Sequence, residues 1–119
     1  MNQNDIRTAI EQVNQLVLQG KAMEAFDKFY ADDIVMQEND NPPTVGKDAN
    51  RAREKEFFGK ITEFRGATVE AVTVGDDTSM VLWHNDYTHA EWGVRKYHQV
   101  AVQTWKDGKI MKERFYYGA

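Results

Sequence analysis

Apolar residues in the first sixty positions of the chain recur at helical intervals. Between Asn4 and Gly20 they are spaced three or four residues apart, which predicts a helix with one apolar stripe that ends at the glycine. The positions of that stripe are Ile6, Ile10, Val13 and Val17. Similar spacing predicts a second helix over residues 21–30 and a third over residues 47–60.

The second half of the chain follows a period of two, in which β-branched residues become frequent. Four strands are predicted, over residues 64–74, 79–90, 95–105 and 110–117. Lys106-Asp107-Gly108-Lys109, between the last two, is typical of a two-residue hairpin loop. A shorter strand is predicted over residues 34–38. Asp32 and Asp33 before it are expected to end the second helix, and the prolines at 42 and 43 end the strand. Helices followed by long antiparallel strands predict an α+β fold and not an alternating parallel one.

Composition narrows the class of protein. A chain of 119 residues has the length of one domain, so we expect a single domain over residues 1–119. The absence of cysteine excludes disulfides, thiolate nucleophiles and cysteine-ligated zinc. A net charge of -4, with acids and bases mixed, argues against nucleic acid as a partner. No signal peptide or membrane-spanning run is visible, and we expect a cytoplasmic protein without a membrane partner.

Several segments resemble the nuclear transport factor 2-like superfamily, and within it the SnoaL-like and ketosteroid-isomerase-like branches. They are Gly20 between two helices, FYADDIVM at 29–36, PPTVGKDA at 42–49, QTWKDGKI at 103–110 and RFYYG at 114–118. The resemblance implies a cystatin-like α+β cone. Three N-terminal helices would pack into the concave face of a strongly curved, mostly antiparallel sheet, with a pocket at the open end. It also implies a homodimer through the outer face of the sheet.

Glu38 is the first candidate catalytic residue. In isomerase-like members of this superfamily the strand after an FADD-type segment ends in the carboxylate that acts as general base, and that position here is Glu38. Met36 shares the same strand face, because side chains alternate along a strand. The isomerases also have a tyrosine where this chain has Val13 and a neutral acid where it has Ala101. Without those donors there is no comparable oxyanion hole, so steroid isomerisation is not supported.

Alternation assigns further residues to the pocket. If Ala101 faces inward by analogy, the same face carries Tyr97, Gln99, Gln103 and Trp105, and the last strand adds Glu113, Phe115 and Tyr117. The preceding strand depends on the turn near residues 91–93. A turn of even length would turn inward Leu82, His84, Asp86 and Thr88, whereas one of odd length would select Trp83, Asn85 and Tyr87. We favour the first arrangement.

These residues lead to a functional hypothesis. We expect a small organic ligand in the pocket and cofactor-free proton transfer of the isomerase, cyclase or lyase type, with Glu38 as base and His84 and Asp86 as its catalytic partners. Alternatively, Glu38 pairs at the rim with Lys47 or Arg51, and the His84 and Asp86 pair is structural. The domain would then be a non-catalytic ligand-binding module, or a dimeric interaction module.

Two other charged groups have simpler interpretations. Histidines 84, 89 and 98 alternate across the faces of a flat sheet, so no metal site is expected. Arg53 and Glu54 belong to the predicted helix 47–60, whose mixed charges indicate a solvated face with intrahelical pairs. The outer sheet face should carry a mixed apolar patch at the dimer contact: His98, Val100, Val102, Thr104, Lys112, Arg114 and Tyr116.

Overall fold

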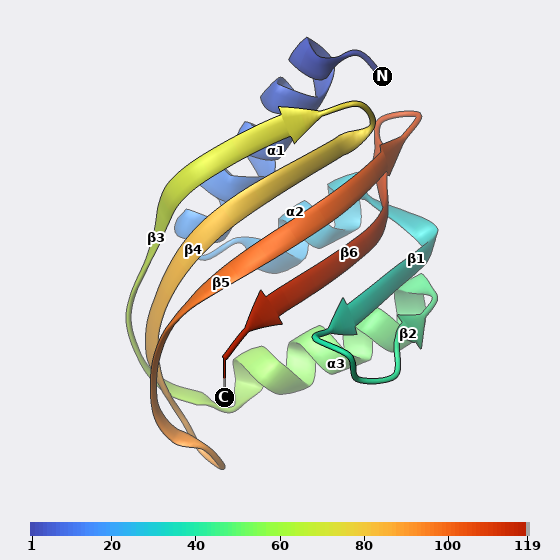
Figure 1. Cartoon of the computed structure of the whole chain (residues 1–119). Coiled ribbons are helices and arrows are strands. Elements are labelled where there is room, and N and C mark those ends of the chain that lie inside the picture. The colour runs from blue at the N-terminus through green and yellow to red at the C-terminus, as the bar shows by residue number, and fades with distance from the viewer. Residues whose placement is uncertain (119) are drawn as a thin grey trace.

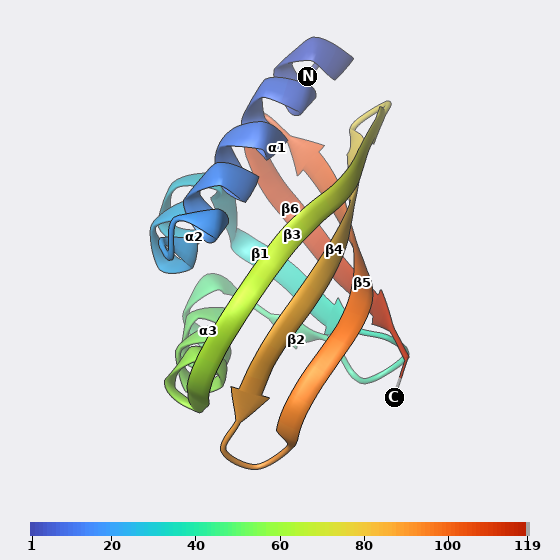
Figure 2. The same ribbon diagram turned by 90° about the vertical axis from the view of Figure 1, so that its left-hand side faces the viewer.

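The structure, a computed structural model, describes residues 1–118 and has the α+β architecture expected from the sequence. In chain order its elements are α1 (Gln3–Leu18), α2 (Ala22–Phe29), β1 (Tyr30–Glu38), β2 (Thr44–Val45), α3 (Lys47–Gly59), β3 (Ile61–Gly75), β4 (Thr78–His89), β5 (Gly93–Lys106) and β6 (Lys109–Tyr117). Within these residues six strands form one sheet in the order β2-β1-β6-β5-β4-β3 (Figure 1). The helices all lie on its concave side (Figure 2). The prediction of three helices against a strongly curved, mostly antiparallel sheet is confirmed.

The two N-terminal helices form where the apolar spacing predicts them. The Oδ1 atom of Asn2 caps α1 by accepting a hydrogen bond from the backbone nitrogen of Asp5 at 2.8 Å. Gly20 has a φ of 78°, in the left-handed region that glycine adopts without steric cost, and it separates α1 from α2. The apolar stripe of α1 faces the sheet, so that Ile6 and Ile10 are fully buried.

The segment after α2 departs from the prediction. Asp32 and Asp33 do not end a helix but lie inside β1, which begins at Tyr30. Both aspartates are exposed, in a stretch where the pairing of β1 with β6 shifts register. That irregularity lets consecutive polar residues stay within a strand. The prolines then reverse the chain into β2, which pairs antiparallel with β1.

The curvature of the sheet has a local cause in β3. Its pairing with β4 shifts register at three places, between Ile61 and Glu63, Phe64 and Gly66, and Val69 and Ala71. Each extra residue on one strand bends it and increases its twist. The predicted hairpin after β5 is present, with positive φ at both Asp107 and Gly108.

Strand register decides which side chains share the concave face. β1 runs parallel to β6, with Met36 opposite Glu113 and Glu38 opposite Phe115. On the other edge of β6, Glu113 lies opposite Gln103 of β5. Residues directly opposite each other on neighbouring strands project to the same side of a sheet. The end of β1 and the middle of β5 and β6 therefore point toward the helices together.

The apolar core lies between α1, α2 and one end of this face. Its completely buried aliphatic members are Ile6, Ile10, Ile34, Val81 and Ile110. No helix within residues 1–118 combines the length and the apolarity needed to cross a membrane.

Candidate functional site

A cavity of about 850 Å³ separates the concave face of the sheet from the helices. That volume lies within the range of small-molecule sites. Of the residues that the sequence assigns to a pocket, those lining this cavity are Met36, Glu38, Tyr97, Gln99, Gln103, Glu113, Phe115 and Tyr117. The structure thus gathers most of the predicted side chains around one space.

The prediction that His84 and Asp86 face the pocket is wrong. Three residues, 90–92, separate His89 of β4 from its partner Gly93 of β5, so the turn has odd length. In this register Trp83 lies opposite Gln99 and Asn85 opposite Tyr97. The inward face of β4 therefore carries Trp83, Asn85 and Tyr87, which is the arrangement that we did not favour.

His84 and Asp86 lie instead on the convex face. The Nε atom of Arg65 donates a hydrogen bond to Asp86 Oδ1 at 2.7 Å, and this bond holds the pKa of Asp86 below its usual value. The rings of His84 and His98 lie side by side, with centroids 4.7 Å apart. These are polar contacts across the outer surface of the sheet and have no access to the cavity.

Trp105 also lies outside the cavity, although it is on the predicted face. It lies under α2, where its ring packs edge-on against Phe29, and only 2% of it is exposed. Its Nε1 atom donates a hydrogen bond to Ser79 Oγ at 2.9 Å. The helix covers this end of the face, so Trp105 belongs to the core and not to the wall of the pocket.

Glu113 anchors a buried hydrogen-bond network beneath the cavity. Its Oε1 accepts from the Tyr30 hydroxyl at 2.5 Å and its Oε2 from Gln103 Nε2 at 2.7 Å. Ser79 Oγ in turn donates to Gln103 Oε1 at 2.6 Å. Burial raises the pKa of Glu113, and the two hydrogen bonds that it accepts oppose this rise only partly.

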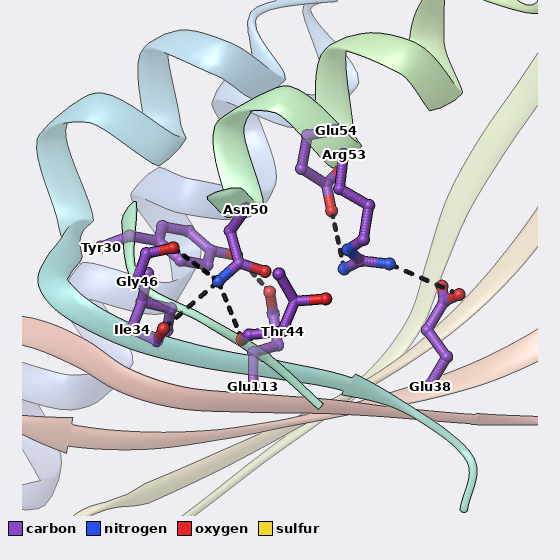
Figure 3. A network of polar contacts seen from close by, with 9 residues as sticks. All are labelled: Tyr30, Ile34, Glu38, Thr44, Gly46, Asn50, Arg53, Glu54 and Glu113. Atoms are coloured by element: carbon purple, nitrogen blue, oxygen red, sulfur yellow. Dashed lines mark hydrogen bonds and ion pairs between the residues drawn. The ribbon is translucent and has the colours of Figure 1, made fainter. Parts of the chain in front are cut away.

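Arg53 reaches from α3 into the space between two carboxylates (Figure 3). Its Nη2 lies 3.3 Å from Oε1 of Glu54 on the same helix, and its Nη1 lies 3.5 Å from Oε2 of Glu38 at the end of β1. The exposed fractions of the three side chains are 30% for Arg53, 19% for Glu54 and 37% for Glu38. The buried Nε of Arg53 has no hydrogen-bond partner among residues 1–118.

The carboxyl group of Glu54 has an unusual pKa. Burial raises it from 4.5 to about 7, because removal from water disfavours the charged form. The positive charge of Arg53 opposes the rise, while the neighbouring carboxyls of Glu113 and Glu38 add to it. A carboxyl group with a pKa near 7 at the wall of a cavity is suited to proton transfer near neutral pH.

The sequence interpretation missed Arg53 and Glu54, which do not form a purely solvated face. A signal for them was present, because residues 50, 53, 54 and 57 have the spacing of one helical stripe. Asn50 is fully buried on that stripe and fixes the start of α3 against β1 and β2. Its Nδ2 donates to the backbone carbonyls of Ile34 at 3.2 Å, Thr44 at 3.0 Å and Gly46 at 2.8 Å (Figure 3). This anchoring aims Arg53 and Glu54 inward.

An aromatic wall closes the side of the cavity formed by β4, β5 and β6. The hydroxyls of Tyr87 and Tyr97 are hydrogen-bonded at 2.8 Å, and the rings of Tyr97 and Tyr117 have centroids 5.5 Å apart. Burial raises the pKa of Tyr97, and its hydrogen bond with Tyr87 raises it further. The guanidinium carbon of Arg95 lies 4.9 Å from the centre of the Tyr97 ring. Within residues 1–118 no group of three or more histidine or acidic side chains could hold a metal ion.

Comparisons with known proteins agree with this architecture. The model of a family described as the SnoaL-like domain matches residues 10–113. A solved structure of a candidate SnoaL-like polyketide cyclase, also labelled carbohydrate phosphatase, from Mesorhizobium loti is 31% identical. The alignment covers 94% of this chain and 98% of the chain in that structure, with a TM-score of 0.85. No curated protein matches significantly.

More distant structures share the fold alone. An epoxide hydrolase from M. tuberculosis, described as LEH-like, is 14% identical; the alignment covers 98% of this chain and 84% of that one, with a TM-score of 0.78. A candidate isomerase from Bacillus subtilis is 19% identical over 99% of this chain and 90% of its own, with a TM-score of 0.79.

Proposed function

Because the chain belongs to the SnoaL-like domain family, within the nuclear transport factor 2-like superfamily, we propose that its cavity binds a small organic molecule and catalyses cofactor-free proton transfer on it. The observation that carries this proposal is the bridge that Arg53 makes between Glu38 and Glu54 at the cavity wall. The reaction class is that of an isomerase, cyclase or lyase, as the resemblance implies.

The two carboxyl groups of the bridge are suited to different roles. Glu54, with its pKa near 7, is the proton acceptor and donor, since a general base works best when its pKa is near the working pH. Glu38, which is more exposed, stays paired with Arg53 and helps to hold its guanidinium in place. The sequence suggested Glu38 as the base, and the environment of the neighbouring carboxyl now favours Glu54.

The proposed step is removal of a proton from carbon next to a carbonyl group. Glu54 takes the proton, the C–H electron pair moves toward the carbonyl oxygen, and the resulting enolate is reprotonated from the same carboxyl. Arg53 supplies positive charge beside this reaction, and fixed charges stabilise developing negative charge strongly in a partly water-excluded site. Steroid isomerisation remains outside the proposal, because Val13 and Ala101 line the cavity without any donor group.

Exchange of carbon-bound protons in heavy water tests the proposal. Propiophenone and 2-tetralone serve as probes, and nuclear magnetic resonance follows the loss of their α-proton signals above the buffer rate. We expect Glu54→Gln to lower the protein-dependent rate by about a hundredfold or more, since general base catalysis is worth that factor. Glu11→Gln is the control, because Glu11 is exposed on α1 and does not line the cavity.

Equal exchange rates in the wild type and Glu54→Gln would contradict the role of Glu54. Binding of a probe without any exchange above buffer would favour the alternative function, a ligand-binding module without catalysis.

We also propose that the protein is a homodimer through the convex face, as the family resemblance implies. Apolar residues support this contact, since Val102 lies opposite Met80, and both Met80 and Tyr116 are more than two-fifths exposed, at 46% and 43%. Light scattering should give twice the chain mass for the wild type and the single mass for Val102→Lys. A monomeric wild type at tens of micromolar would rule this contact out.

A further inference from the structure

Arg95 is a cationic side chain of the cavity wall that forms no ion pair with an acidic side chain of residues 1–118. The arginines that form ion pairs within residues 1–118 are Arg51, Arg53, Arg65 and Arg114, and Arg95 is not among them. Its Nε is buried and has no hydrogen-bond partner within the same residues. A buried donor without a partner is costly, and native structures usually satisfy such a group with protein, water or a ligand.

The surroundings of Arg95 fix its guanidinium over the aromatic wall. It stacks on Tyr97, whose ring packs in turn against Tyr117. Arg95 is also close enough to Tyr117 to lower the pKa of that phenol, which burial raises first and Glu38 raises further. Tyr117 therefore lies within the electrostatic reach of both Arg95 and Glu38, and it connects the two charged regions of the cavity.

The two arginines of the cavity consequently differ in what they can offer a ligand. Arg53 is held between two carboxyl groups, so both of its terminal nitrogens already have acidic partners in Glu38 and Glu54. Among residues 1–118, Arg95 stacks on the face of Tyr97 and its Nε has no hydrogen-bond partner, so its hydrogen-bonding fork is available to a ligand. An arginine fork matches the two oxygens of a carboxylate in geometry and in charge.

From this arrangement we infer that the cavity selects organic carboxylates with a flat, unsaturated body, and that Arg95 binds the carboxylate group. The inference rests on the proposed function of the cavity and adds the chemical class of its ligand. The flat body would lie along the aromatic side chains of Tyr87, Tyr97 and Tyr117, where stacking on ring faces is favourable. The carbon to be deprotonated would then extend toward Glu54.

A matched pair of probes isolates the contribution of charge. 2-Naphthoate and 2-naphthamide have the same ring system and similar size but differ in charge, and their affinities are measured by isothermal titration calorimetry at pH 7.5. We expect the wild type to bind the acid about tenfold or more tightly than the amide, since charge-assisted hydrogen bonds are roughly twice as strong as neutral ones. Arg95→Gln should bring the ratio of the two affinities close to one.

Two further variants separate charge from geometry and from general effects. Arg95→Lys keeps the charge without the fork, so it should retain part of the preference for the acid. Arg7→Gln, on the exposed surface of α1, should leave the ratio unchanged. Circular dichroism of each variant confirms that the fold is intact, and the wild-type ratio by itself already tests the inference.

Several results would overturn the inference that Arg95 binds a ligand carboxylate. One is equal affinity of the wild type for 2-naphthoate and 2-naphthamide, and another is a preference for the acid that survives in Arg95→Gln. Loss of the preference in Arg53→Gln alone would assign the anion to the other arginine. Failure of 2-naphthoate to bind at millimolar concentration also rejects the inference. Proton exchange without acid preference would reject only the ligand class, whereas acid preference without exchange would reject only the catalysis.

Discussion

Acidic groups on the concave and convex sides of this sheet are in opposite electrostatic states. On the concave side Glu54 and Glu113 are shielded from water, and burial raises the pKa of each carboxyl. On the convex side Asp86 accepts a hydrogen bond from Arg65, and the pKa of its carboxyl is lowered. Carboxyl groups therefore hold a proton more readily on the concave side, whereas on the convex side they stay ionised.

This contrast shows where acid–base chemistry can take place in the molecule. A carboxyl group with a pKa far below neutrality is a poor proton carrier at neutral pH, whatever its position in the sequence. A carboxyl group raised by burial in a cavity is a better candidate, especially beside a fixed positive charge. The cavity on the concave side meets both conditions through Glu54 and Arg53 of α3, whereas His84 and Asp86 on the convex face do not line a cavity.

The largest difference between the faces should appear in stability. Trp105→Ala removes a fully covered concave side chain, and truncation of a buried tryptophan typically costs about 3–5 kcal/mol of unfolding free energy. Its sequence neighbour Thr104 is exposed on the convex face, so Thr104→Ala should change that free energy by no more than about 0.5 kcal/mol. Urea unfolding of both variants measures the difference, and comparable losses would contradict the assignment of faces.

Much of the fold could be predicted because its signals are local. The stripe of α1, the glycine after it and the Asp107-Gly108 loop each depend on a few neighbouring residues, and the structure has all three. The family resemblance was confirmed as well, although its motifs are mostly structural. Residues assigned to the cavity from β5 and β6 followed from one inward reference position, Ala101, and simple alternation.

The face of β4 was predicted wrongly because it depends on the parity of a single turn. Gly93 has a φ of 75°, and a left-handed glycine is typical at the end of a three-residue hairpin loop. Stacking of His89 on Trp92, with ring centroids 3.7 Å apart, accompanies that loop. The aromatic residues at odd positions of this strand, Trp83 and Tyr87, line the cavity instead of His84 and Asp86.

The role of α3 was missed for a different physical reason. Charged residues on a helix usually face water, and local sequence does not reveal that a second element covers them. Burial raises the pKa of Glu54, and Glu113 of β6 and Glu38 of β1, which the strand register brings to the same space, add to this rise. That juxtaposition brings Glu113 next to Glu54, 59 positions earlier in the sequence (113 − 54), so the raised pKa of Glu54 could not be predicted from α3 alone.

The second expected effect is a pH dependence of stability that comes from Glu54. Its pKa is about 7 in the folded protein against 4.5 in the unfolded chain, so the folded state binds the proton more tightly. Stability contributed by this group is therefore full below about pH 4.5 and falls as the pH rises toward 7, by on the order of 2–3 kcal/mol. Glu54→Gln cannot ionise, so relative to the wild type it should gain that amount between pH 5 and pH 8. Urea unfolding at the two pH values checks this, and an unchanged difference between variant and wild type would contradict the raised pKa.

The smallest effect should come from the convex face, and it should have the opposite sign. The pKa of Asp86 is lowered by Arg65, so its contribution to stability is present above the unfolded value of 3.8 and is lost as the pH falls through the folded value. Asp86→Asn should therefore be slightly less stable than the wild type at pH 7, with the deficit shrinking in acid. The effect is small because water screens an exposed ion pair. The comparison would fail if the unfolding free energies of Glu54→Gln and Asp86→Asn, each relative to the wild type, changed in the same direction with pH. Opposite slopes in one protein would show that burial on the concave side, and not the carboxyl group itself, makes Glu54 a proton carrier.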